Sequence, residues 1–133
     1  DISIKNCIKI ILYLEDLIKR TSKHSIRVRD KMNKKEYCNY ISSMGIKSIL
    51  YEVASTPKPG LVDRNNPGAH DDMDFFTFLS SASVLNSYFY DCTKAGIEFE
   101  GKDYRSLLNN IRPIGIKAEK DMFKATKGVN THK

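Results

Sequence analysis

The residues best suited to chemistry gather in one stretch of 25, from Glu52 to Phe76. It holds five acids, one histidine and two basic residues, together with three of the four prolines and two of the seven glycines in the chain. Proline and glycine are typical of turns and loops. The stretch is therefore interpreted as a charged loop between two apolar helices, and it is where we expect the functional site.

Three carboxylates in this stretch, Glu52, Asp63 and Asp72, are hard oxygen ligands. Magnesium usually takes one or two protein carboxylates and completes its shell with water and substrate phosphates. Lys58 and Arg64 can hold phosphate oxygens through charge-assisted hydrogen bonds. The residue types therefore predict a phosphate and magnesium site. The alternative interpretation of the same residues is a solvated, well-capped loop.

Backbone features of the stretch favour a bound anion. Gly60 and Gly68 permit close approach of backbone to a ligand. A helix is predicted to start near His70 to Asp72, and the free N–H groups of a first turn attract anions. His70 is a candidate general acid or base. The pair His70-Asp71 also raises the alternative of an HD-type metal-dependent phosphohydrolase, although the only histidine upstream is His24.

Helices must position this loop. Apolar residues at three- and four-residue steps predict helices over 2–18 and 34–55. The second should end before Pro57, since residues that precede proline avoid the α region. A central, buried helix is predicted from about residue 70–72 to Ala95, with Gly96 as its stop. Asp103 is predicted to cap a short helix through Asn110, and Pro113 to begin another. No segment alternates like a strand, so we expect an all-α, helical bundle-like domain.

Charge and cysteine content limit the function classes. The net charge is +6, but eight of the 22 Lys and Arg residues lie between Lys19 and Lys35 beside one acid, so that segment carries +7. Basicity confined to a segment argues against a nucleic-acid-binding core. A helical binding module whose basic arm docks an acidic partner or RNA remains the non-enzymatic alternative.

Three widely spaced cysteines, without a CxxC pair, predict reduced thiols in a cytoplasmic protein. No apolar run is long enough to span a membrane, and residues 1–18 lack the features of a signal peptide.

Three ordered motifs carry a family resemblance. They are Thr-Pro-Lys-Pro-Gly-Leu-Val-Asp at 56–63, Gly-Ala-His-x-Asp-Met-Asp-Phe at 68–75, and Gly-Val-Asn-Thr-His-Lys at 128–133. Together they resemble the triphosphoribosyl-dephospho-CoA synthase family. The resemblance implies an all-helical fold and a reaction of ATP with 3′-dephospho-CoA that releases adenine and makes the prosthetic-group precursor of citrate lyase, or of malonate decarboxylase.

The resemblance also implies site residues. Phosphate or nucleotide binding is expected at Lys58, Gly60, Arg64, Gly68, Asn130 and Lys133. Catalytic candidates are Glu52, His70, Asp72 and His132, for stabilising a cation-like ribose and for acid–base work. Metal ligands for Mg²⁺ are expected among Glu52, Asp63 and Asp72.

The chain departs from the family's pattern in two places and in extent. Lys127 stands where a second glycine is usual before Gly128, and Asp71 where a basic residue is common. The chain resembles only the N-terminal portion of such an enzyme, so we expect it to be inactive alone and to expose apolar surface.

Residues 1–33 form an N-terminal helix and basic linker in this interpretation, either as a plain extension or as a remnant of a fused phosphoribosyl-dephospho-CoA transferase. Residues 34–133 are the truncated synthase domain. The partners implied are nucleotide substrates and, through the transferase, the citrate lyase acyl-carrier protein.

Overall fold

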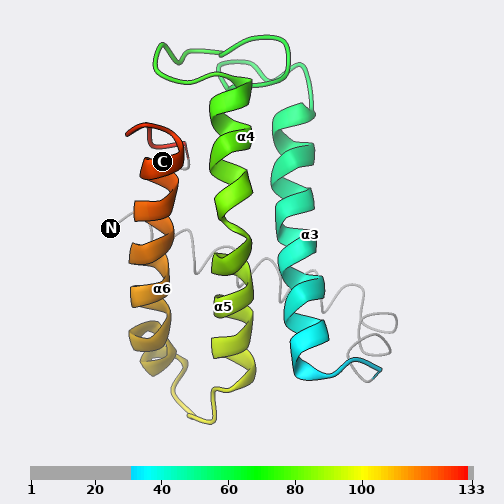
Figure 1. Ribbon diagram of the computed structural model, residues 1–133, viewed down its shortest axis with the longest axis vertical. Helices are drawn as coiled ribbons and strands as arrows, with labels where there is room; N and C mark the ends of the chain where they lie inside the picture. The colour runs from blue at the N-terminus through cyan, green and yellow to red at the C-terminus, as the bar shows by residue number, and fades with distance from the viewer. Residues whose placement is uncertain (1–30, 132–133) are drawn as a thin grey trace.

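The computed structural model describes residues 31–131, and within that range every regular element is a helix. In chain order these are α3 (Lys34–Ala54), α4 (Phe75–Val84), α5 (Asn86–Ile97) and α6 (Tyr104–Ala125). Figure 1 shows three columns, with α4 and α5 end to end in the middle, α3 on one side and α6 on the other. The predicted all-α class is confirmed. The predicted helix over 2–18 and most of the basic segment lie outside the described residues.

Helix α3 matches its prediction because both of its ends are encoded locally. At its start, the side chain of Asn33 accepts a hydrogen bond from the Glu36 N–H, and the Glu36 carboxylate accepts one from the Asn33 N–H, each at 3.0 Å. This reciprocal pair is a capping box. At its end, Ser55 caps the helix, and its N–H donates to the carbonyl of Tyr51. Ser55 stands two residues before Pro57.

The prediction of one continuous helix from residues 70–72 to Ala95, with Gly96 as its stop, is wrong in three respects. Gly96 does not end the helix, because α5 includes it and runs to Ile97. The helix begins at Phe75, because Asp74 is its cap and accepts hydrogen bonds from both the N–H and the hydroxyl of Thr77, each at 2.7 Å. It then breaks at Leu85, whose N–H donates to Ala82, only three residues back. A serine-rich last turn accompanies the break, and serine hydroxyls compete for helix carbonyls, as Ser83 does for that of Ser80.

The two helices predicted on either side of Pro113 are in fact one. Helix α6 begins after the Asp103 cap and passes through Pro113 without ending. A proline inside a helix costs about 3 kcal/mol. Burial of Ile111, Gly115 and Met122 on this helix accompanies its packing against α4 and α5. Tertiary packing of this kind supplies most helical stability in proteins and here outweighs the local penalty.

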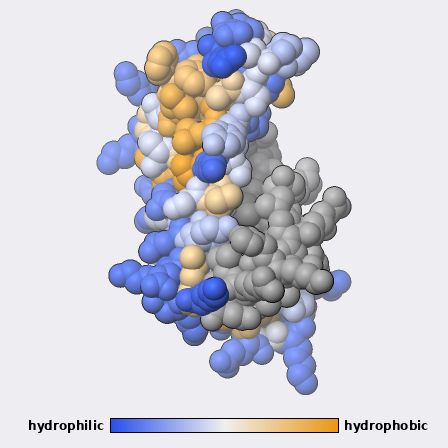
Figure 2. Space-filling model, turned by 90° about the vertical axis from the view of Figure 1, so that its right-hand side faces the viewer, coloured by the Kyte–Doolittle hydropathy of each residue, from blue (hydrophilic) through white to orange (hydrophobic). Residues whose placement is uncertain are grey.

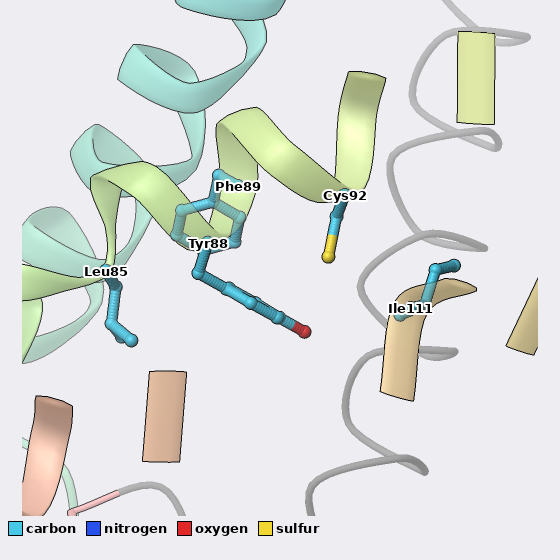
Figure 3. Close-up of a cluster of buried hydrophobic side chains, with 5 residues drawn as sticks. All are labelled: Leu85, Tyr88, Phe89, Cys92 and Ile111. Atoms are coloured by element: carbon cyan, nitrogen blue, oxygen red, sulfur yellow. The ribbon is translucent and has the colours of Figure 1, made fainter. Parts of the chain in front are cut away.

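The core lies between α5 and its two neighbours. Leu85, Tyr88, Phe89 and Cys92 follow one another at helical steps, and Ile111 of α6 completes the cluster (Figure 3). Ile46 and Ile49 of α3 pack against it. The central position predicted for this segment is confirmed, but its burial is limited to one side, with Ser81 and Ala82 buried in α4 and Tyr88, Phe89 and Cys92 in α5. Burial is the main cause that raises the pKa of the Cys38 thiol in α3. Cys92 of α5 is also buried.

Apolar side chains are also exposed at the end of the molecule that carries the α3–α4 loop. Phe76 is 71% exposed, Tyr51 64% and Leu61 54%. Figure 2 shows hydrophobic surface gathered in that half of the molecule. Among residues 31–131, no helix is long and apolar enough to cross a membrane.

Candidate active site

The loop between α3 and α4 is built around the carboxylate of Asp63, which is 1% exposed. One oxygen accepts hydrogen bonds from the Thr56 hydroxyl at 2.8 Å and from the Lys58 N–H at 3.1 Å. The other accepts from the N–H groups of Asn65 at 2.7 Å and Asn66 at 3.0 Å, and from the Asn66 side chain at 3.4 Å. These donors, the Asn65 N–H foremost, lower the pKa of Asp63 to about 2. Asp63 is therefore an ionised carboxylate that holds the loop together through its hydrogen bonds.

The loop contains a turn at each of its two glycines. At Pro59-Gly60 the N–H of Leu61 donates to the Lys58 carbonyl at 3.1 Å, and Gly60 has a φ of 76°. This combination is typical of a type II turn. At the second turn, Gly68 has a φ of 65°, and a Cβ atom there would lie 2.6 Å from the backbone of Leu61. The two turns are thus in direct contact, and only glycine fits at position 68.

Lys58 points back to the end of α3. Its ammonium lies 2.6 Å from the Glu52 carboxylate, and its side chain is 15% exposed while that of Glu52 is 50% exposed. The negative end of the α3 dipole also favours a cation here. An anionic ligand that used Lys58 would therefore have to displace Glu52 from it.

His70 and Asp72 face each other more loosely. The closest approach is 3.9 Å between Nδ1 of His70 and a carboxylate oxygen of Asp72, which is an ion pair only when the histidine is protonated. Their side chains are 37% and 66% exposed. Arg64 is exposed on the same loop. These three residues are accessible to a ligand, unlike Asp63.

The third motif starts where α6 ends. Thr126 caps the helix, and the N–H of Gly128 donates to the Phe123 carbonyl at 2.8 Å. This is the closure of a Schellman motif, in which the residue before Gly128 adopts the left-handed conformation and is usually glycine. Lys127 occupies that position with a φ of 56°. The departure noted in the sequence therefore falls on a backbone position that glycine would satisfy better.

The third motif is then tied to α4. The Thr131 hydroxyl donates to the Ser81 hydroxyl at 2.6 Å, and both side chains are buried. Asn130 is half-buried. His132 and Lys133 lie outside the described residues.

The structure therefore joins the predicted site residues in groups. Glu52 meets Lys58, His70 approaches Asp72, and the backbones at Gly60 and Gly68 touch. In the part of the chain that is described, no three His, Cys, Asp or Glu side chains converge on a metal position. Asp63 fits poorly as a ligand because both of its oxygens already accept hydrogen bonds from the loop. Glu52 and Asp72 are exposed, and each can supply one oxygen ligand.

Sequence reasoning missed the residues that hold the site: Thr56, Asn65, Asn66, Ser81 and Thr126. Two signals were present: Thr56 opens the first motif, and Asn-Asn-Pro-Gly predicts a turn. Which carboxylate the asparagine N–H groups would bind depends on the folded loop. The Ser81 contact spans 50 residues of sequence and has no local signal.

Comparison with known proteins agrees with the motifs. Residues 38–133 match the family described as ATP:dephospho-CoA triphosphoribosyl transferase, CitG. The chain is 47% identical over 102 residues to a probable 2-(5″-triphosphoribosyl)-3′-dephosphocoenzyme-A synthase of Streptococcus mutans, covering 77% of this chain and 34% of the relative. It is also 47% identical over 93 residues to the protein of the same description in Streptococcus pyogenes serotype M5, covering 70% and 32%.

The chain thus spans about a third of the length of these curated relatives. No solved structure matches it significantly. Because the family match covers most of the chain and all three motifs, the chain belongs to the CitG family of ATP:dephospho-CoA triphosphoribosyl transferases.

Proposed function

We propose that this chain is part of an enzyme that transfers the 5-triphosphoribosyl group of ATP to the ribose 2′-hydroxyl of 3′-dephospho-CoA. The bond from ribose C1′ to adenine breaks, a bond from C1′ to the acceptor oxygen forms, and the hydroxyl proton leaves to a base. The product would be the prosthetic-group precursor of citrate lyase or malonate decarboxylase. The observation that carries the proposal is the family match over residues 38–133, which includes the ordered loop around Asp63.

The triphosphate must be held without being cleaved. Lys58 is suited to this role because its backbone N–H is held by Asp63 and its ammonium lies at the end of α3 beside the exposed Glu52. A triphosphate carries more charge than one carboxylate, so it can compete with Glu52 for the ammonium. Arg64, Asn130 and Lys133 are proposed as further contacts, with Gly60 and Gly68 admitting the ligand close to the backbone.

Magnesium would neutralise part of the triphosphate charge when bound. Glu52 and Asp72 are the residues proposed to contribute ligands, alongside water and phosphate oxygens. Asp63, which was included in the predicted ligand set, contributes instead by fixing the loop, because ligation would remove hydrogen bonds from buried donors.

The remaining roles follow from accessibility. Glu52, once released from Lys58, places a negative charge where it can stabilise a cation-like ribose. His70 and Asp72 are exposed and close enough to exchange a proton through water, which suits a base for the 2′-hydroxyl and an acid for the departing adenine. His132 is the alternative acid or base.

The test is product detection in the full-length protein that carries this segment. Incubation with ATP, Mg²⁺ and 3′-dephospho-CoA should release adenine and give a triphosphoribosylated dephospho-CoA by mass spectrometry. Asp72→Ala should reduce both products strongly, whereas the matched change Asp71→Ala, at the adjacent exposed acid, should not. Absence of adenine from the unsubstituted enzyme would overturn the proposed function, and full activity in Asp72→Ala would remove Asp72 from the site.

A further inference from the structure

The hydrogen bond between Ser81 and Thr131 is the feature of the fold that the proposed function leaves unused. Ser81 is completely buried in α4, and Thr131 is 7% exposed at the end of the described chain. Their hydroxyl oxygens are 2.6 Å apart although 50 residues separate them in sequence. Buried hydroxyls are almost always paired. This pairing therefore specifies where the third motif lies on α4.

The neighbouring serines show that this contact is not a general property of the helix. Ser80 and Ser83 are exposed, and each donates to a carbonyl of its own helix, at 2.8 and 2.7 Å. Such bonds are local and fix nothing outside α4. Ser81 alone of the three meets a side chain from another motif.

The segment that reaches Ser81 is held along its length. The Thr126 hydroxyl oxygen lies 2.9 Å from the Met122 carbonyl oxygen and 2.5 Å from the Val129 carbonyl oxygen, so its one hydrogen is shared between these two acceptors. Gly128 closes the helix end through Phe123. The turn from α6 to Thr131 is consequently ordered, and its far end is attached to α4 by the Ser81 contact.

The other end of α4 carries the second motif. Asp74 caps the helix, and the seven residues from there to Ser81 rise about 10 Å along the axis. Asp74, just after the His70–Asp72 pair, and Thr131, just after Asn130, are therefore attached to the same helix about two turns apart. Helix α4 thus sets the distance between two motifs that are remote in sequence.

We propose that Ser81 is a positioning residue for the reaction, which sets the third motif in register with the His70–Asp74 segment through Thr131. This inference rests on the proposed function, because the register matters only if both motifs act on the same substrate. Ser81 itself is buried and touches no ligand. Its loss shifts Asn130, which precedes Thr131, and a displacement of about 1 Å in an active site lowers turnover by up to 100-fold.

The test compares Ser81→Ala and Thr131→Val with Ser80→Ala in the full-length enzyme. The two changes at the buried pair should each lower kcat for adenine release by about 10- to 100-fold per folded molecule. Their combination should lower it no further, since both remove the same contact. Thr131→Ser keeps the hydroxyl and should restore turnover, and Ser80→Ala should leave kcat within twofold.

Two measurements separate positioning from simple stability. Amide exchange of the 126–131 segment should rise in Ser81→Ala but not in Ser80→Ala, while the Tm of each variant reports global folding. A kcat within twofold of the unsubstituted enzyme in both Ser81→Ala and Thr131→Val would overturn the inference. If the unsubstituted enzyme releases no adenine, the proposed function fails first. Unchanged amide exchange of the 126–131 segment in Ser81→Ala would show that the Ser81–Thr131 hydrogen bond does not hold this segment, and would overturn the inference whatever the activity.

Discussion

Gly45 in α3 offers the sharpest test of how the bundle is packed. It is buried against α5, and a Cβ atom placed there would lie 2.9 Å from two carbons of the Phe89 ring. Carbon atoms in contact prefer separations of about 3.5–4.0 Å. The Gly45→Ala variant must therefore push α3 away from α5 by several tenths of an ångström or move the ring, which is 4% exposed within the core.

Two opposing effects set the size of the change. Alanine is better than glycine inside a helix by about 1 kcal/mol. Overpacking a well-filled core costs about 1–3 kcal/mol. Gly45→Ala should therefore lower the free energy of unfolding by up to about 2 kcal/mol, even though it removes a glycine from a helix.

Gly96→Ala in α5 is the matched control. A Cβ atom there meets nothing within 4 Å, so only the propensity gain of about 0.5–1 kcal/mol remains. Urea denaturation followed by circular dichroism should place Gly96→Ala above the unsubstituted chain and Gly45→Ala below it. Phe89→Leu should cost less stability in the Gly45→Ala background than alone. If Gly45→Ala is as stable as Gly96→Ala, the close helix contact is refuted.

Three further outcomes follow from the site. Lys127→Gly should raise the free energy of unfolding in urea by up to about 1 kcal/mol. The left-handed conformation costs an ordinary residue about 1–2 kcal/mol, and the greater entropy of glycine in the unfolded state offsets part of the gain. Lys127→Ala keeps the strained φ and should not be stabilised. The pKa of Asp63 is about 2 when folded and about 3.9 when unfolded, so its contribution to stability is complete above pH 4 and is lost as the pH falls towards 2. Asp63→Asn should be less stable than the unsubstituted chain at pH 6, and its stability should fall less between pH 4 and pH 2. Urea midpoints that fall equally with pH in the two proteins would contradict this. In the full-length enzyme, Lys58→Met should raise KM for ATP about tenfold or more, as expected for a lost charged hydrogen bond. Glu52→Gln, which removes the charge proposed to stabilise the cation-like ribose, should lower kcat. An unchanged KM for ATP in Lys58→Met would remove Lys58 from the phosphate site.

The helices illustrate what sequence can and cannot specify. The ends of α3 are set by neighbours within a few residues, Asn33 with Glu36 and Ser55 ahead of Pro57, so they could be predicted. The start of α4 could not, because Asp71, Asp72 and Asp74 are all reasonable caps and the fold uses the last of them. The continuation of α6 through Pro113 depends on its packing against α4 and α5, which local propensity does not contain.

The candidate site divides in the same way. The motifs gave the residue types, and the turns at Gly60 and Gly68 follow from the preferences of proline and glycine. The partners of Asp63 could not be predicted, because a loop carboxylate is equally suited to a metal, a substrate or backbone N–H groups. The assignment of residues 1–33 to a separate segment stays a prediction, as do the roles of His132 and Lys133.

Burial separates two kinds of polar residue in this site. Asp63, Ser81 and Thr131 are buried and have their hydrogen bonds made within the protein. Glu52 and Asp72 are exposed and retain oxygens for a ligand. A carboxylate with a pKa of about 2 is a weak base at neutral pH, and one that accepts five hydrogen bonds has little capacity to stabilise a new cation.

The same charge at positions 63 and 72 therefore has different consequences. At 63 it orders the loop that presents Lys58, and at 72 it stays available beside His70. Equal residue types in two neighbouring motifs are thus given different roles by the hydrogen bonds that the fold provides, which is why the site has to be built from the folded loop rather than from the motifs alone.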